Sequence, residues 1–310
     1  MSAAGFGYMP YPPAGAGPGA GTQIPPQALS FNPFAPAFTP ATSGQQRPHS
    51  QSRSRSRSPM RGKGKGQFPE KRDERAQPSR ASGGIPNPTP EYLVHASLPP
   101  LLLPHPRQIL VVIDLNGTLL FRPSRKNPSQ FVERPHARRF LSYCIDTFHV
   151  AIWSSAKPDN VRRMCDQLMT PEQRQRVVAI WGRDKFGLDA ADYNRRVQCY
   201  KRLGALWGAH EVARTHPRFD EGVRWSQADT VLIDDSLEKA RSEPYNLVPI
   251  PEFMGDPNEP GYILPQVHDY INECSRQADI STYIRMSPFQ SKANFMLGAP
   301  AVANAAAPAA

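Results

Sequence analysis

The feature that most constrains the fold is a set of short apolar runs that do not alternate with polar residues. Residues 109–113 read Ile-Leu-Val-Val-Ile, residues 149–153 read His-Val-Ala-Ile-Trp, and residues 229–233 read Asp-Thr-Val-Leu-Ile. Continuous β-branched runs are typical of strands covered on both faces, because a half-exposed strand alternates apolar with polar positions. The chain is therefore expected to contain a sheet buried between two layers.

Amphipathic stretches separate these apolar runs. The expected strands are residues 108–113, 148–153, 177–181, 229–233 and 246–250. The expected helices are about 135–147, 158–168, 195–207 and 236–241. Strands that alternate with helices predict an α/β fold with a parallel, doubly wound sheet.

Composition divides the chain into a folded middle and two tails. Residues 1–90 are rich in Gly, Pro, Ala and Ser, which leave too little apolar surface to offset the entropy of ordering the backbone, so we expect disorder there. Residues 287–310 predict a second, Ala- and Pro-rich tail, and residues 91–286 the folded domain. Residues 1–85 hold 11 Lys and Arg against 3 Asp and Glu, which is +8 of the net +10. The basic charge therefore does not predict nucleic-acid binding by the folded part.

A basic run lies inside the first tail. Residues 52–58 alternate Ser with Arg, and lysines extend the run to residue 66 between glycines. One interpretation is a solubilising linker. The other is a switchable patch that attracts RNA or an acidic protein, and whose sign reverses as each phosphate adds about −1.5 to −2 charge.

Polar side chains follow the apolar runs. Asp114 follows the expected strand 108–113, Ser154 follows 148–153, and Asp234 and Asp235 follow 229–233. Lys201 precedes or opens the helix that leads to the strand 229–233. Ligands of open α/β sheets bind at the carboxyl ends of the strands, so these side chains are expected at one rim. Carboxylates, a hydroxyl and an ammonium together suit a phosphate held beside Mg²⁺.

Each of these residues also has a purely structural interpretation. Asp235 and Glu238 have the spacing of a capping box, and Ser154 or Ser155 is placed to cap the helix that follows. A single lysine on a helix is usually solvated. Only the joint order of the residues favours a site.

That order resembles the haloacid-dehalogenase (HAD) superfamily, and within it the branch of RNA-polymerase C-terminal-domain phosphatases and NLI-interacting-factor-like proteins. The matching segments are Asp114-Leu-Asn-Gly-Thr118, Ile152-Trp-Ser-Ser155, Cys199-Tyr-Lys201 and Ile233-Asp-Asp-Ser236. The resemblance covers about residues 105–285. It implies a HAD-like Rossmannoid domain.

The resemblance also implies roles for individual residues. Asp114 would be the nucleophile that takes the phosphoryl group as an aspartyl-phosphate. Thr118 and Ser154 would bind phosphate oxygens. Lys201 would neutralise charge on Asp114 and on the transferring group.

A metal site follows from the same resemblance. Asp235 would hold Mg²⁺ together with Asp114 and the backbone carbonyl of residue 116, with Asp234 supporting the metal shell or Lys201. Asn116 departs from the family pattern, in which an Asp protonates the leaving oxygen and then activates water. An amide does neither, and general acid/base catalysis typically contributes about 10²- to 10⁴-fold.

Motif spacing leaves no room for a large cap domain, because only 40 positions separate Asp114 from Ser154, and 47 separate Ser154 from Lys201. An open site favours a macromolecular ligand such as a phosphorylated protein segment. Two kinds of function stay open: a weak Mg²⁺-dependent phosphoserine/phosphothreonine phosphatase, and a pseudophosphatase that serves as a binding or scaffold module. The second includes an import-translocase-like module and an RNA-processing adaptor.

Cysteine usage and hydropathy bear on the compartment. The four cysteines show no metal-ligand spacing, which suits a reducing compartment. No apolar run approaches the roughly 20 residues of a membrane-spanning helix, and no basic residue precedes Arg47. With the tail and the family resemblance, these features predict the nucleus or cytosol and disfavour the mitochondrion.

Overall fold

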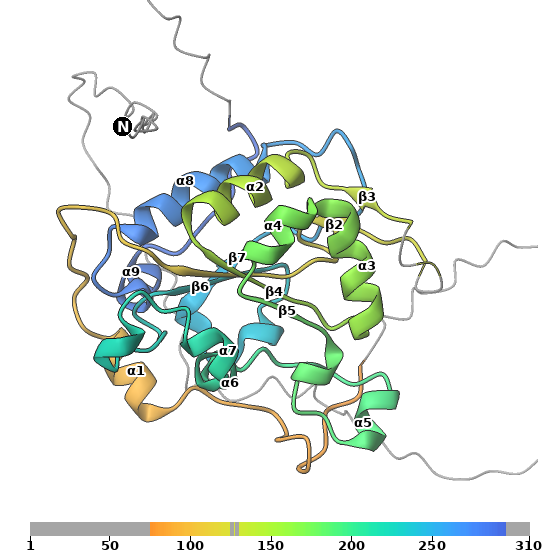
Figure 1. Ribbon diagram of the computed structural model, residues 1–310, viewed down its shortest axis with the longest axis horizontal. Helices are drawn as coiled ribbons and strands as arrows, with labels where there is room; N and C mark the ends of the chain where they lie inside the picture. The colour runs from red at the N-terminus through yellow and green to blue at the C-terminus, as the bar shows by residue number, and fades with distance from the viewer. Residues whose placement is uncertain (1–74, 125–126, 128–129, 296–310) are drawn as a thin grey trace, which may run out of the picture. The chain divides into compact units, whose positions relative to one another are not determined.

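A five-stranded parallel sheet forms the centre of the molecule (Figure 1). The computed structural model describes residues 75–124, 127 and 130–295. The strands lie in the order β5 (Ala179–Trp181), β4 (His149–Trp153), β1 (Leu110–Ile113), β6 (Thr230–Asp234) and β7 (Leu247–Pro249). All four neighbouring pairs are parallel. The predicted parallel α/β sheet is confirmed.

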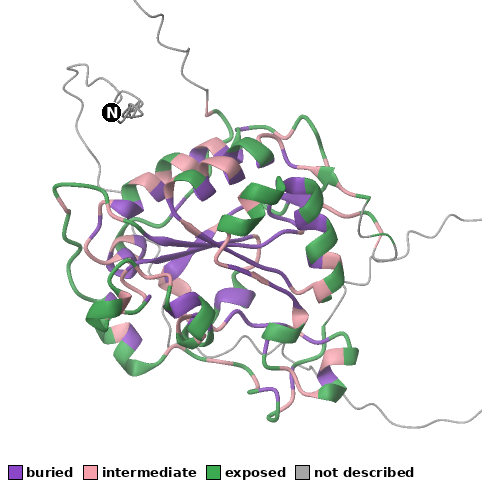
Figure 2. Cartoon of the chain, in the orientation of Figure 1, coloured by how far each residue is buried: buried purple, intermediate pink, exposed green. Residues whose placement is uncertain are grey.

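Helices cover both faces of the sheet, as the unbroken apolar runs predict (Figures 1 and 2). On one face Val111 and Ile113 of β1 belong to a core cluster with α2 (Ala137–Thr147), α3 (Pro158–Leu168) and α8 (Ile263–Ser275). On the other face Leu110 and Val112 pack in a second cluster with α6 (Leu203–Gly208). Successive β1 residues thus bury alternate faces, so every position is apolar.

The remaining elements are short. The other helices are α1 (Pro90–Ala96), α4 (Pro171–Arg176), α5 (Ala190–Asn194), α7 (His210–Ala213) and α9 (Ile280–Met286). The 3₁₀ turns are η1 (Arg183–Lys185), η2 (Phe219–Glu221), η3 (Glu238–Ala240) and η4 (Pro244–Asn246). An antiparallel pair, β2 (Leu120–Phe121) with β3 (Val132–Glu133), follows β1. Between β1 and β4 the described residues form only this pair and α2, which agrees with the expected absence of a large cap.

Two predicted helices differ from the structure. The helix expected at 195–207 begins only at Leu203, because the preceding residues are extended and Ala76 pairs with Val197 in a parallel bridge. The helix expected at 236–241 is the single 3₁₀ turn η3. In both places contacts from elsewhere in the chain replace the helix that the local pattern favours.

Packed structure extends beyond residues 91–286 at both ends. Before it, Ala76 N donates to Arg196 O at 3.1 Å, and Ser82 Oγ donates to Asp192 Oδ2 at 2.7 Å. After it, Phe289 is buried and Gln266 Nε2 donates to the carbonyl of residue 292 at 2.8 Å. The segment 75–90 folds onto the domain although its composition resembles the tail. The Arg-Ser run at 52–66 lies outside the described residues.

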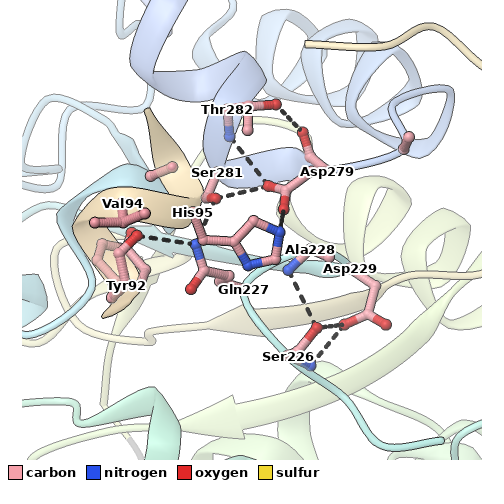
Figure 3. Close-up of polar contacts among 12 residues, drawn as sticks. Tyr92, Val94, His95, Ser226, Gln227, Ala228, Asp229, Asp279, Ser281 and Thr282 are labelled. Atoms are coloured by element: carbon pink, nitrogen blue, oxygen red, sulfur yellow. Dashed lines mark hydrogen bonds and ion pairs between the residues drawn. The ribbon is translucent and has the colours of Figure 1, made fainter. Parts of the chain in front are cut away.

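Polar contacts fix the amino end of β6 (Figure 3). Asp279 caps α9 by accepting from Thr282 N at 3.1 Å, and His95 Nε2 of α1 lies 2.9 Å from its other oxygen. Gln227 donates from Nε2 both to Tyr92 O and to Ser281 Oγ. These contacts join α1, α9 and the loop before β6. Within the described part of the chain, no helix has the length and hydropathy to cross a bilayer.

Candidate active site

The strand order places three sequence-predicted residues at one edge of the sheet. Because β1 lies between β4 and β6, Asp114, Ser154 and Asp234 are brought together at neighbouring carboxyl ends. Asp114 N donates to Ile233 O at 3.0 Å, which continues the β1–β6 ladder to the first carboxylate. All three side chains are buried. Their position is set by the order and register of the strands.

Lys201 reaches this edge from an extended segment. Its backbone N donates to Lys239 O at 2.7 Å, and its side chain is fully buried. Its Nζ lies 3.1 Å from Asp114 Oδ1 and 2.5 Å from Asp234 Oδ2. The predicted lysine is therefore an ion-pair partner of two carboxylates, and not a solvated residue of a helix.

Lys239 is a functional candidate that the sequence reasoning missed. Its Nζ lies 2.8 Å from Asp114 Oδ2, 2.9 Å from Asp234 Oδ1 and 3.4 Å from Asp235 Oδ1. The residue is only 4% exposed. Lys239 comes four residues after Asp235, and side chains at this spacing meet on a helical turn. This spacing could have predicted that the two side chains lie together.

Asp235 completes the cluster. Oxygens of Asp114, Asp234 and Asp235 lie within 4.8 Å of one another, and Thr118 Oγ1 donates to Asp235 Oδ1 at 3.4 Å. Gly117 has φ +90°, and a Cβ there would lie 2.8 Å from Asp235 Cγ. Glycine is thus required for the close approach of the two loops. Three carboxylates at the ends of two neighbouring strands are a donor set that fits Mg²⁺.

Burial and neighbouring charges set the ionisation of the cluster. Burial opposes the charge on Asp234, but Lys201 and Lys239 outweigh it and lower the pKa of that carboxyl to about 2. Burial raises the pKa of Asp235 to about 6, against the attraction of Lys239 and with repulsion from Asp114. Burial also acts to lower the pKa of Lys239, but the three carboxylates raise it well above its usual value. Lys239 therefore stays charged and is a poor proton donor.

Asn116 serves the loop structure. Its Oδ1 accepts from Arg122 N at 3.0 Å, and the next residue, Gly117, donates from its N to Leu120 O at 2.8 Å. The side chain thus closes the turn between β1 and β2. Aspartate accepts the same hydrogen bond through a carboxylate oxygen, so the turn does not require an amide.

Arg134 supports this loop and was also missed. Its side chain is fully buried, and its guanidinium donates to Thr118 O at 3.0 Å and to Pro251 O at 2.8 Å. Glu259 pairs with it at 2.6 Å. Arg134 therefore ties the Asp114 loop to the loop after β7. Sequence position just before a predicted helix gave no sign of this role.

The capping interpretations are not observed. Lys157 is the N-cap of α3, without a side-chain cap, and Ser154 Oγ instead accepts from Ala156 N at 3.4 Å. Glu238 Oε1 accepts from Tyr200 OH at 2.8 Å, and at η3 it is Ser236 Oγ, not Asp235, that accepts from a backbone N, that of Lys239 at 3.4 Å. Ser154 and Asp235 are therefore not occupied as helix caps.

These features define the class of protein: an α/β domain whose parallel strands end in a lysine-paired aspartate cluster, with an aspartate directly after the central strand. Residues 109–281, more than half of the chain, match the family model described as NLI interacting factor-like phosphatase. The chain belongs to this family. The resemblance stated from the sequence motifs is confirmed.

One curated relative agrees with this assignment. The chain is 33% identical over 195 residues to an uncharacterized FCP1 homology domain-containing protein of Schizosaccharomyces pombe, covering 58% of this chain and 77% of that protein. Among solved structures, fission yeast RNA polymerase II CTD phosphatase Fcp1 bound to beryllium fluoride matches at 14% identity and TM-score 0.32. A second Fcp1 structure matches at 15% identity and the same TM-score. The match covers 47% of this chain and 42% of each Fcp1 chain.

Proposed function

We propose that this phosphatase-like domain acts on phosphoserine or phosphothreonine in protein segments, with Asp114 as nucleophile and with turnover limited by Asn116. The observation that carries the proposal is the pairing of Asp114 Oδ1 with Lys201 Nζ at 3.1 Å. Ser154 follows the strand next to β1, and Thr118 Oγ1 donates to Asp235, so two hydroxyls belong to the same edge. An ammonium at this place offsets the negative charge that a phosphoryl group brings to a carboxylate. The absence of a large cap in the described domain favours a macromolecular substrate.

The reaction has two displacements. An Asp114 oxygen attacks phosphorus and the bond from phosphorus to the seryl oxygen breaks, which leaves an aspartyl-phosphate and an alkoxide. Water then attacks the phosphorus, inorganic phosphate leaves, and the Asp114 carboxylate returns. Asn116 neither protonates the alkoxide nor takes the proton of the water, so both protons exchange with solvent. An aryl phosphate, whose leaving group needs no proton, loses least.

The carboxylates also fit the metal of the family. Asp114, Asp235 and the backbone carbonyl of residue 116 would hold Mg²⁺, while Asp234 keeps Lys201 in place. The metal would supply positive charge that offsets repulsion between carboxylates and phosphate. This assignment rests on the oxygen donors and on the family.

Replacing Asn116 tests the proposal. With Mg²⁺, full-length Asn116→Asp is expected to hydrolyse a phosphoserine peptide about 10²- to 10⁴-fold faster than wild type, because it restores a proton donor and keeps the hydrogen bond to Arg122 N. A smaller gain is expected on an aryl phosphate. Asp114→Asn in the same background should remove the gained activity. An Asn116→Asp protein that is folded yet silent would refute the proposed mechanism.

One control guards against an artefact. Asn116 precedes Gly117, a pair prone to deamidation, so mass spectrometry of the peptide that contains residue 116 should accompany each rate. Activity that grows with the deamidated fraction belongs to that fraction and not to wild type.

A binding module is the second candidate function. Lys239 holds the second oxygen of Asp114 at 2.8 Å, and Asn116 lacks the acid, which together favour recognition over turnover. This function predicts that wild type binds a phosphoserine peptide, that the unphosphorylated peptide does not bind, and that bound peptide stays phosphorylated even in Asn116→Asp. A nuclear or cytosolic location, and a partner for residues 52–66, stay predictions that imaging and pull-down of the tagged chain would test.

A further inference from the structure

A buried ammonium lies among the carboxylates that the family would offer to a metal. Lys239 Nζ is within 3.4 Å of one oxygen from each of Asp114, Asp234 and Asp235. No other described lysine or arginine contacts all three, since Lys201 pairs with Asp114 and Asp234 only. Lys239 comes from η3, which follows β6; Asp234 is the last residue of that strand and Asp235 the next residue.

The charges of the cluster nearly balance because of Lys239. Three carboxylates and the Lys201 ammonium alone would leave two uncompensated negative charges in a buried place. With Lys239 only one remains. Buried like charges are costly unless a cation lies among them, so the folded chain needs some cation here, and Lys239 supplies one covalently.

Mg²⁺ and the ammonium compete for the same atoms. The cation would use oxygens of Asp114 and Asp235, and Lys239 Nζ already contacts one oxygen of each. A divalent ion at those oxygens would also be repelled by the ammonium that contacts them. The side chain and the metal therefore cannot both use the cluster fully.

We propose that Lys239 is a tethered cation that takes the place of the divalent metal in the resting domain, so that Mg²⁺ binds only as this side chain withdraws. The inference rests on the proposed function in taking the carboxylates as the metal site. Its consequence is a weak affinity for Mg²⁺ and a resting state in which Asp114 Oδ2 is held by an ammonium.

Calorimetric titration of MgCl₂ into the full-length protein tests the proposal. Lys239→Met is expected to bind Mg²⁺ at least tenfold more tightly than wild type, a difference of about 1.4 kcal/mol. The control is Lys157→Met, which removes an exposed lysine that follows β4 at the same edge of the sheet and is expected to bind within twofold of wild type. Equal or weaker binding by Lys239→Met, or no binding by either protein, would overturn the proposal.

Thermal unfolding provides a second readout. In EDTA, Lys239→Met should melt below wild type because the carboxylates repel one another, and Mg²⁺ should raise its melting temperature more than that of wild type. A variant that folds only with Mg²⁺ supports the proposal. If Lys239→Met folds under neither condition, Lys239→Gln, which keeps a polar group, replaces it, and an equal Mg²⁺ response of Lys239→Gln and wild type would overturn the proposal.

Hydrolysis separates this inference from the proposed function. If Lys239→Met binds Mg²⁺ more tightly while Asn116→Asp and wild type stay silent on every phosphate ester, the tethered cation stands and the phosphatase mechanism falls. If Asn116→Asp is active and Lys239→Met leaves Mg²⁺ affinity unchanged, the mechanism stands and the tethered cation falls.

Discussion

The two ends of β6 both carry aspartates, but these are neutralised in different ways. At the amino end, Asp229 Oδ1 accepts from Ser226 N at 2.7 Å, and Asp279 Oδ1 accepts from Thr282 N, so each carboxylate has a backbone donor three residues away (Figure 3). The second oxygen of each faces an imidazole, with His216 Nε2 3.4 Å from Asp229 and His95 Nε2 2.9 Å from Asp279. At the carboxyl end, Asp114 is satisfied by Lys239, 125 residues away in the sequence. The amino end combines local turns with single imidazole partners, whereas three aspartates at the carboxyl end share two buried ammoniums.

This difference indicates which buried ionised side chains the fold keeps for function and not for stability. A capped turn gains a hydrogen bond at little cost. A buried group of three carboxylates and two ammoniums pays a large desolvation penalty that apolar residues would avoid. Perturbed ionisation in such clusters is typical of functional sites. We therefore infer that the carboxyl end of β6 is the functional edge and the amino end the structural one.

The largest effect on this comparison should come from Lys201→Met. The change leaves Asp234, which is fully buried, with Lys239 as its one ammonium partner among the described residues. Breaking a buried pair typically costs about 3–5 kcal/mol. Urea unfolding in EDTA should show a loss of unfolding free energy of that size. A loss below about 1 kcal/mol would mean that Asp234 does not depend on the Lys201 ammonium for charge compensation.

A smaller loss is expected from Gly117→Ala. Both the positive φ of +90° and the approach of a Cβ to 2.8 Å from Asp235 Cγ oppose the substitution. Gly222→Ala is the matched control, because its φ is +85° and no atom lies within 4 Å of the added Cβ. The control should lose about 1–2 kcal/mol from backbone strain alone, and Gly117→Ala at least 1 kcal/mol more. Equal losses in urea unfolding would show that the two loops are not tightly apposed.

The smallest effect should come from the amino end. Asp279→Ala removes the cap of α9, which typically costs about 1 kcal/mol. This end is separate from the aspartate cluster, so Asp279→Ala should leave the Mg²⁺ affinity of the wild-type protein unchanged. Added to Asn116→Asp, it should also leave any hydrolysis by that variant unchanged. A change in Mg²⁺ affinity would break the proposed division between the two ends.

The sequence predicted the sheet well because its strands carry their own signal. A run such as residues 109–113 is apolar at every position, and its place in the middle of the sheet follows from the same property. Once the strands were predicted to be parallel, the polar residues directly after them could be predicted to lie together, because the carboxyl ends of parallel strands lie at one edge of the sheet. Asp114, Ser154 and Asp234 meet there.

What the sequence did not predict depends on contacts between distant segments. Lys239 and Arg134 are ordinary cations in the sequence, and only the folded loops surround them with acceptors. The helix expected at 195–207 fails at its first turns because residue 76 pairs with residue 197. Local propensity competes with tertiary contacts, and at these places the tertiary contacts prevail.

The segment 75–84 bears on how the protein should be shortened for study. Tyr200, the neighbour of Lys201, has its hydroxyl oxygen 3.1 Å from Gln77 Oε1, and Ser79 N donates to Asp192 Oδ2 at 2.7 Å. A fragment cut to residues 109–281 would lose both contacts and would free the extended chain that presents Lys201 to Asp114. If such a fragment lacked phosphatase activity, the cause could be the missing segment as well as Asn116. In a fragment that begins before residue 75 the segment is present, so a lack of activity can be attributed to Asn116.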